Sequence, residues 1–356
     1  MGSTFPIGAT ISKVHRIFAE IFKIINEMKN KVFLLAIAIT SVFFTGCKKL
    51  KISEPGNLVP KTVTEDLSLP SITVNGAKFH SEAFGPPDSS IILVLHGGPA
   101  ADYRYLYNCK EFANQGFRVV FYDQRGTGLS QRFPKSHYTS LQQCYDDMTA
   151  IIAYHRTSAT QKVFLLGHSW GAMLAGAYIN TYPNAVNGAV LAEPGGLVWE
   201  DVKKYIKASQ KMAITSEALN NATYIDQFIT GKNEEHEILD YKFMMLASTG
   251  NETNITGDER PIEKWRPGAV FQTACFDIGN EQNPNWTTNL HLFNTKVLFI
   301  YSEKNSAYGL AHAQKVSAPF PNVALFKTMG AGHSMLSFPT GWNNTYPVML
   351  NYFKSL

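Results

Sequence analysis

The sequence predicts an α/β protein with a mostly parallel central sheet, helices on both faces of that sheet, and an inserted helical lid. Two observations carry this prediction. Short apolar runs typical of buried strands alternate with longer segments of helical periodicity, which is the pattern of a parallel sheet with crossover helices. The alternation stops at about residue 196, where helical stretches follow one another without buried strands, and it resumes at about residue 291. The intervening segment is therefore expected to cover the sheet.

The elements are expected in a definite order. Residues 70–84 predict a hairpin, because two strand-like runs flank the turn-forming pair Asn75-Gly76. Further strands are expected within residues 91–99, 117–126, 162–171, 187–196, 296–305 and 322–329. Helices are expected within residues 103–116, 140–156, 172–183, 309–319 and 346–356, and in the inserted segment within residues 200–214 and 234–248. Gly116 and Pro183 are typical residues for ending a helix.

Composition excludes several classes of function. The chain has 356 residues, 45% hydrophobic and 17% charged, as in an ordinary globular protein, and its net charge of +4 is too small for a nucleic-acid-binding surface. Cys109, Cys144 and Cys275 show no paired spacing, and the cysteines and histidines show no metal-site pattern. We therefore expect buried thiols, with one disulfide left open, and no metal, cofactor or nucleic-acid partner.

The N-terminal part has the features of a secretory signal peptide over residues 28–46. Two lysines precede an apolar run that ends at Phe44 and is shorter than the roughly 20 residues of a transmembrane helix. The sequence Phe44-Thr45-Gly46-Cys47 resembles the lipobox of bacterial lipoproteins, in which leucine is usual where Phe44 stands. The resemblance implies cleavage before Cys47, lipidation of that cysteine, and anchoring in a membrane of the bacterial cell envelope.

This interpretation also divides the rest of the N-terminal part. Residues 1–27 would be an extra segment before a true start at Met28, and residues 47–65 would form a polar tether. The alternative is an uncleaved amphipathic anchor, because apolar residues before Met28 also fall at helical spacing, namely Phe18, Ile21, Phe22 and Ile25.

The strongest functional motif is Gly-x-Ser-x-Gly, which runs from Gly167 to Gly171 around Ser169. In a nucleophile elbow a serine occupies a strained turn between a strand and a helix, so its neighbours must be small and its hydroxyl stands clear of the backbone. The motif here follows an apolar strand and opens a helix, as an elbow requires. The backbone N–H of Trp170, at the helix N-terminus, is then expected to stabilise an oxyanion.

Two further motifs fit the same chemistry. His96-Gly97-Gly98-Pro99 ends an earlier strand, where bare backbone can approach a substrate and the N–H of Gly98 can serve as the second oxyanion donor. His96 itself is expected to be structural. His333 follows the last strand in a glycine loop, and a histidine at that point of the chain is the expected general base.

Together with the stretch from Asp123 to Ser130, these motifs resemble the proline iminopeptidase family of α/β-hydrolases. The resemblance implies an α/β-hydrolase core made of residues 66–195 and 291–356 and a helical lid of residues 196–290. It also implies structural roles for the aspartate and arginine of that stretch, Asp123 and Arg125. Two departures are Ala100, where the family usually has glycine, and His168, where it more often has glycine or alanine.

The sequence does not fix the third member of the expected catalytic triad, the acid that pairs with the histidine. After the strand within residues 296–305 the family carries an aspartate, but Asn305 stands there and cannot hold the charge that orients and stabilises an imidazolium. Glu193 ends the strand after the nucleophile, a place where some α/β-hydrolases, including certain haloalkane dehalogenases, carry their acid. The alternatives are a salt bridge to the lid for Glu193, Glu303 as the acid, or no working acid.

The sequence therefore predicts a serine hydrolase with Ser169 as nucleophile, His333 as base and Glu193 as acid, acting through an acyl-enzyme. The family resemblance implies an aminopeptidase that releases N-terminal residues, including proline, from short peptides and holds the free amino group with lid carboxylates. A carboxylesterase of the same fold and a catalytically silent binding protein are the alternatives. The sequence does not fix the oligomeric state. Candidate amine-binding carboxylates in the lid are Glu200, Asp201, Glu217, Asp226, Glu234, Glu235, Glu237 and Asp240.

Overall fold

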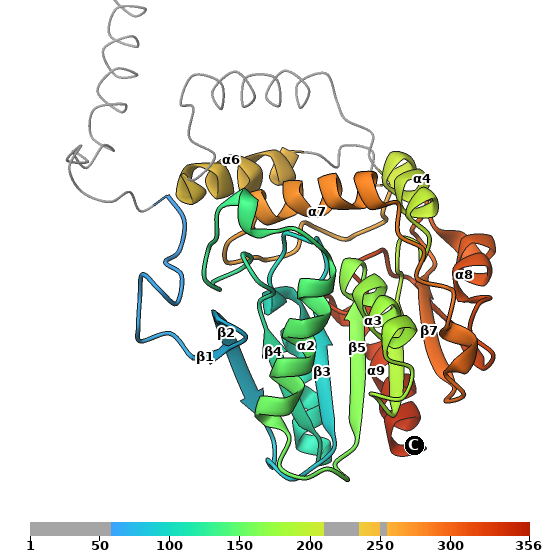
Figure 1. The fold of residues 1–356 in the computed structure, drawn as a ribbon. Helices are drawn as coiled ribbons and strands as arrows, with labels where there is room; N and C mark the ends of the chain where they lie inside the picture. Colours follow the sequence, from blue (N-terminus) through green and yellow to red (C-terminus); the bar gives the residue numbers. More distant parts are fainter. Residues whose placement is uncertain (1–57, 210–234, 250–254) are drawn as a thin grey trace, which may run out of the picture. The chain divides into compact units, whose positions relative to one another are not determined.

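The structure is a computed structural model, and it describes residues 58–209, 235–249 and 255–356. Eight strands form one sheet in the order β1-β2-β4-β3-β5-β6-β7-β8 (Figure 1). The first two strands form the predicted hairpin, and β2 also pairs antiparallel with β4, while all other pairings are parallel. The strands are β1 (Ser71–Val74), β2 (Ala77–Phe84), β3 (Ile91–Leu95), β4 (Arg118–Tyr122), β5 (Val163–His168), β6 (Gly188–Ala192), β7 (Val297–Ser302) and β8 (Val323–Thr328).

Helices cover both faces of the sheet, as the sequence predicts. On one face α2 (Gln142–His155), α3 (Trp170–Thr181) and α8 (Gly309–Ser317) share a core with strand residues such as Leu93 and Leu165. On the other face the 3₁₀ helix η1 (Tyr103–Gln115) and α9 (Pro339–Lys354) share a core with the alternate positions, such as Val94 and Leu166. The central strands are buried on both sides, which explains their continuous apolar runs.

Two helices differ from the sequence prediction in detail. The segment at Tyr103–Gln115 winds as a 3₁₀ helix and ends at Gly116, whose φ of 87° is the left-handed conformation of a helix end. The last helix begins at Pro339 and not at Tyr346, so Pro347 lies inside it. Packing of Trp342, Met349 and Phe353 against the sheet outweighs the cost of that proline.

Three helices lie in the inserted segment: α4 (Trp199–Ser209), α6 (His236–Thr249) and α7 (Ala269–Gln282). They lie above the carboxyl ends of the parallel strands, with α7 between α6 and α4 (Figure 1). Helix α7 was not among the predicted helices, although its buried residues recur at helical spacing: Val270, Phe271, Ala274, Cys275 and Ile278. The short 3₁₀ helices η2 (Lys135–His137) and η3 (Leu290–Leu292) complete the elements of the described residues.

A buried charge cluster ties the insertion to the core. Asp240 of α6 accepts hydrogen bonds from Arg132 Nε at 3.0 Å and Arg266 Nε at 2.7 Å. All three side chains are almost completely buried, and Arg266 also pairs with Glu65. Asp240, a candidate amine-binding carboxylate in the sequence, is therefore engaged in holding the fold together.

Some of the sequence predictions concern residues outside the ranges that the structure describes. The signal peptide, Cys47 and most of the tether lie outside the described residues, as do Glu217, Asp226 and Glu234. None of the helices within the described ranges has the length and hydropathy that crossing a membrane requires. Cys109, Cys144 and Cys275 are buried free thiols, which confirms that prediction.

Candidate active site

Ser169 occupies a sharp turn between β5 and α3. Its backbone has φ 56° and ψ −120°, a conformation that a residue with a side chain adopts rarely. Small neighbours are obligatory, because a Cβ on Gly167 would lie 2.3 Å from the Gly171 carbonyl oxygen and one on Gly171 would lie 2.0 Å from the Leu95 oxygen. The Gly-x-Ser-x-Gly motif therefore forms the strained elbow that the sequence predicts.

The two expected oxyanion donors lie beside this serine. The N–H of Trp170 is the first of α3 and has no acceptor within the helix. Gly98 has φ 124°, and a Cβ there would lie 2.2 Å from the Ala100 backbone nitrogen, so only glycine fits. Gly98, Trp170 and Ser169 all line one cavity.

Glu193 and His333 meet although they are far apart in sequence. Glu193 follows β6 with φ 44° and is completely buried, and its Oε2 lies 2.6 Å from His333 Nδ1. Its other oxygen accepts hydrogen bonds of 2.6 Å from both the backbone N–H and the hydroxyl of Ser302. The structure thus joins the predicted acid to the predicted base in the geometry in which a carboxylate orients an imidazole.

This contact shifts the pKa values of both partners. Burial would raise the pKa of Glu193, but hydrogen bonds from His333 and Ser302 and the charge of His333 bring it below its ordinary value. Burial would lower the pKa of His333, but the hydrogen bond and charge of Glu193, with a smaller effect of Asp258, raise it above its ordinary value. Asp258 also accepts a 2.6 Å hydrogen bond from the Ser334 backbone, next to the base.

The other candidate acid, Glu303, and Asn305, which stands where the family has its aspartate, have different surroundings. Glu303 is exposed, and its carboxylate pairs with Lys327 at 3.1 Å and accepts a 2.9 Å hydrogen bond from the Gly330 backbone. Asn305 is buried and donates a 2.9 Å hydrogen bond from Nδ2 to Glu193 Oε2. Of the three residues, Glu193 is the carboxylate that contacts the histidine.

His168 holds the loop of His333 near the elbow, a role that was not predicted from the sequence. Its Nε2 donates a 2.7 Å hydrogen bond to the backbone oxygen of His333, and the two rings lie 4.7 Å apart between centroids. Its Nδ1 lies 2.9 Å from the Tyr105 hydroxyl, which in turn accepts a 2.6 Å hydrogen bond from the Gly97 N–H. This chain of contacts joins the oxyanion loop, the elbow and the loop of the base. The unusual histidine within Gly-x-Ser-x-Gly was its only sequence signal.

Burial keeps His168 neutral. It lowers the pKa of the imidazole to about 3, and the charge of His333 acts in the same direction. A neutral ring has one donor and one acceptor nitrogen, which matches one bond to a carbonyl oxygen and one from a hydroxyl.

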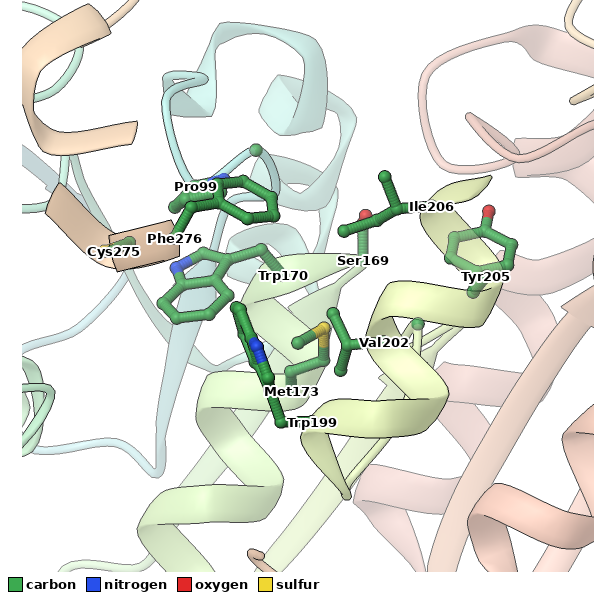
Figure 2. Close-up of a pocket in the computed structure, with 12 residues that line it drawn as sticks. Pro99, Ser169, Trp170, Met173, Trp199, Val202, Tyr205, Ile206, Cys275 and Phe276 are labelled. Atoms are coloured by element: carbon green, nitrogen blue, oxygen red, sulfur yellow. The ribbon is translucent and has the colours of Figure 1, made fainter. Parts of the chain in front are cut away.

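The cavity at Ser169 is lined mainly by apolar side chains. Figure 2 shows the serine near its centre, between side chains of the elbow region, α4 and α7. The cavity has a volume of about 50 Å³, counted as the space open to the centre of a water molecule. No charged side chain of the described residues is in the lining, which consists of Gly98, Pro99, Ser169, Trp170, Met173, Gly195, Trp199, Val202, Tyr205, Ile206, Cys275 and Phe276.

The lid carboxylates that can be placed have other partners. Glu200 pairs with Lys203 at 2.5 Å, and Asp201 pairs with Lys315 at 2.5 Å. Glu237 accepts a 2.9 Å hydrogen bond from the Leu58 backbone. The structure therefore assigns none of these predicted carboxylates to the cavity. Within the described chain, no cluster of histidine, cysteine, aspartate or glutamate is arranged to hold a metal ion.

The remaining motif residues hold the loop beside the oxyanion donors. Asp123 lies 2.7 Å from His80 Nδ1 and accepts hydrogen bonds from two backbone N–H groups. Arg125 forms a buried ion pair with Asp147 at 2.5 Å. His96 accepts a 3.0 Å hydrogen bond from the Gln124 backbone. These contacts support the predicted structural roles of Asp123, Arg125 and His96.

Comparison with known sequences gives partial matches. A sequence model of the family described as serine aminopeptidase, S33, matches residues 86–254, less than half of the chain. Epoxide hydrolase B of Mycobacterium tuberculosis is 27% identical over 121 residues, which cover 33% of this chain and 33% of that protein. Proline iminopeptidase of Heyndrickxia coagulans is 32% identical over 137 residues, which cover 38% of this chain and 45% of that protein. The chain thus matches less than half the length of these curated relatives.

Solved structures match over most of the chain. The structure of VinJ has a TM-score of 0.56 at 16% identity and covers 80% of this chain and 98% of its own. A proline iminopeptidase-related protein from Thermus thermophilus has a TM-score of 0.53 at 19% identity and covers 79% of this chain and 96% of its own. At these identities the likeness concerns the fold. Sheet order, elbow and structural matches together show that the chain has the α/β-hydrolase fold.

Proposed function

We propose that the protein is a serine hydrolase that acts through an acyl-enzyme. The observation that carries this proposal is the 2.6 Å contact between Glu193 and His333, because it supplies the charged partner that Asn305 cannot provide. The same contact argues against a catalytically silent binding protein, since that alternative depended on a missing acid. The elbow at Ser169 and the two backbone donors beside it support the assignment.

The reaction would proceed in two halves. His333 Nε2 accepts the proton of the Ser169 hydroxyl as the serine oxygen attacks the substrate carbonyl, and the N–H groups of Gly98 and Trp170 stabilise the oxyanion. His333 then gives the proton to the leaving group as its bond to the carbonyl carbon breaks, which leaves the acyl-serine ester. Water, deprotonated by the same imidazole, attacks the acyl-serine ester and regenerates the enzyme. Glu193 holds the imidazole with Nδ1–H toward itself, which leaves Nε2 free to take a proton.

For the substrate we propose an N-terminal residue of a short peptide, proline included. The serine aminopeptidase family model and the proline iminopeptidase from Heyndrickxia coagulans support this choice. A carboxylesterase is the second candidate, and the apolar lining of the cavity favours it, because a free α-amino group needs an acidic partner there.

Two assays test these proposals. Labelling with a fluorophosphonate tests the nucleophile, and the expected result is modification of Ser169 in the wild type and none in Ser169→Ala. A panel of amino-acid arylamides and short-chain nitrophenyl esters then separates the substrate classes. Faster arylamide hydrolysis supports the aminopeptidase, whereas ester hydrolysis alone supports the esterase. A wild-type protein that neither reacts with the label nor turns over any substrate contradicts both.

We also propose that the protein is a lipoprotein anchored through Cys47 in the bacterial cell envelope. The lipobox-like sequence before Cys47 supports this proposal. Growth of a bacterial expression host with an alkyne fatty acid should label the wild type but not Cys47→Ser. Equal labelling of the two would contradict it.

A further inference from the structure

Asn305 is a buried amide beside the triad that takes part in none of the proposed catalytic steps. Each carboxylate oxygen of Glu193 accepts two hydrogen bonds. The backbone N–H and the hydroxyl of Ser302 donate the two hydrogen bonds to Oε1. Oε2 is shared by His333 Nδ1 at 2.6 Å and Asn305 Nδ2 at 2.9 Å. The amide and the base therefore contact the same carboxylate atom.

The orientation of Asn305 is determined on both sides of its amide. Its Oδ1 accepts a 3.2 Å hydrogen bond from the Ala307 backbone, so the NH₂ group faces Glu193. Nδ2 also donates to the Tyr205 hydroxyl oxygen at 3.1 Å, and that oxygen lies 3.3 Å from His333 Nδ1. Asn305 is 1% exposed and is absent from the lining of the cavity at Ser169.

The chemistry of these contacts requires a neutral donor at position 305. A buried carboxylate stays ionised only when hydrogen bonds replace the water it has lost. A lysine or arginine would neutralise Glu193 and compete with the imidazolium that the carboxylate must stabilise. An aspartate would place a second negative charge against Oε2, and the two carboxylates would then share a proton. An amide donates a hydrogen bond and adds no charge.

We propose that Asn305 is a positioning residue of the triad, whose amide fixes Glu193 Oε2 as the acceptor of the His333 Nδ1–H and keeps that carboxylate ionised. The inference rests on the proposed serine-hydrolase function. Asn305 reaches the base through Glu193 and through the Tyr205 hydroxyl, and it does not itself line the substrate cavity. Its removal should therefore lower turnover and not substrate binding.

Asn305→Ala removes the donor and should lower kcat about ten- to a hundredfold, the range for losing a hydrogen bond to a charged group, with KM changed less than about twofold. Asn180→Ala is the matched control. Asn180 is also a buried amide, but it lies on α3 and contacts Thr288 and Asn289, away from the triad. This control should lose thermal stability without losing kcat.

Asn305→Asp gives a second readout that does not depend on removing a buried side chain. At neutral pH the new carboxyl and Glu193 hold one proton between them, and the protonated oxygen replaces the amide donor. When that proton leaves at higher pH, two negative charges face His333 and raise its pKa. The pH profile of kcat/KM should therefore contain an ionisation that the wild type lacks.

The experiment measures kcat and KM of the full chain between pH 5 and 10 for the wild type and the three variants, on the best substrate of the panel, with thermal unfolding alongside. Loss of kcat in Asn305→Ala but not in Asn180→Ala, with a new ionisation in Asn305→Asp, supports the inference. An Asn305→Ala variant with wild-type kcat, or an Asn305→Asp profile identical to that of the wild type, overturns it and leaves the serine-hydrolase proposal intact. An inactive, unlabelled wild type would overturn both.

Discussion

Two turns at the carboxyl ends of neighbouring strands share a positive backbone φ and differ in the surroundings of the side chain. Ser169 after β5 has φ 56° and Glu193 after β6 has φ 44°, and the Ser169 N–H donates a 2.8 Å hydrogen bond to the Ala192 oxygen. Ser169 lines the open cavity, whereas Glu193 is fully buried with four donors on its carboxylate.

The difference shows how one strained turn can serve two chemical purposes. A left-handed residue at the end of a parallel strand costs on the order of 1–3 kcal/mol, and the surrounding sheet must hold it in place. In the first turn the strain places a hydroxyl at the cavity. In the second it directs a carboxylate away from solvent and toward an imidazole. The environment of each side chain is therefore the basis on which we propose Ser169 as the nucleophile and Glu193 as the acid.

The largest expected effect tests the turn at Ser169. Ser169→Ala should lower kcat about 10⁶-fold, because removal of the nucleophile leaves only the binding and oxyanion contributions. Steady-state kinetics and fluorophosphonate labelling measure this, and far-UV circular dichroism checks the fold. Wild-type turnover in this variant would show that the nucleophile lies elsewhere and would contradict the role proposed for Ser169.

The second largest effect tests the turn at Glu193. Glu193→Gln should lower kcat about 10⁴-fold, since a neutral amide allows the wrong imidazole tautomer and leaves the imidazolium unstabilised. Glu193 raises the pKa of His333, and the base must be neutral to act, so the acidic limb of kcat/KM should also move to lower pH in the variant.

Glu303→Gln is the control for this prediction, because Glu303 is an exposed carboxylate one residue beyond β7. It should keep the kcat and the pH profile of the wild type. Equal losses in the two variants would show that the contact at His333 does not distinguish these carboxylates.

A smaller effect concerns the loop that faces the serine. Gly98→Ala should lower kcat about 10²- to 10³-fold, because a Cβ 2.2 Å from the Ala100 nitrogen must shift the oxyanion N–H. Gly76→Ala is a matched control, with φ 70° but no atom within 4 Å of the new Cβ. It should cost stability through its backbone alone and leave kcat unchanged. Wild-type kcat in Gly98→Ala would remove this loop from the oxyanion site.

The smallest effect concerns the opposite pKa shifts of the two histidines beside these turns, His168 and His333. The pKa of His168 is lowered to about 3 in the folded protein, whereas an unfolded histidine titrates near 6.5, so the unfolded chain binds the proton first as the pH falls. At pH 5 this should reduce the free energy of unfolding by about 2 kcal/mol relative to pH 7. His333 has a raised pKa and should contribute with the opposite sign in the acidic range.

Urea unfolding at pH 7 and pH 5 measures the effect of His168. In His168→Gln the loss of stability between the two pH values should be about 2 kcal/mol smaller than in the wild type. The exposed residue His291, changed to glutamine, should leave the wild-type difference in place. An unchanged pH dependence in His168→Gln would contradict burial of a neutral imidazole at this position.

Local patterns predicted the strand, the serine and the helix of the elbow, since each depends on residues within a few positions of Ser169. The chain order of strands also gave Glu193 and His333 as candidates. Their contact could not be chosen over the alternatives, because Glu193 and His333 lie 140 positions apart. Nor could sequence distinguish Glu303, which turns to solvent and Lys327, from a residue turned inward.

The sequence by itself determined the α/β alternation, the two glycines without which the turn at Ser169 cannot close, and the serine between them. These follow from hydrophobic periodicity and from the steric limits of single residues. Only the tertiary structure decided which carboxylate meets the imidazole, that Asn305 supports it, and that His168 ties three loops together. Such choices depend on the order of strands in the sheet and on burial, because hydrogen bonds between distant residues form only where packing brings their atoms within about 3 Å.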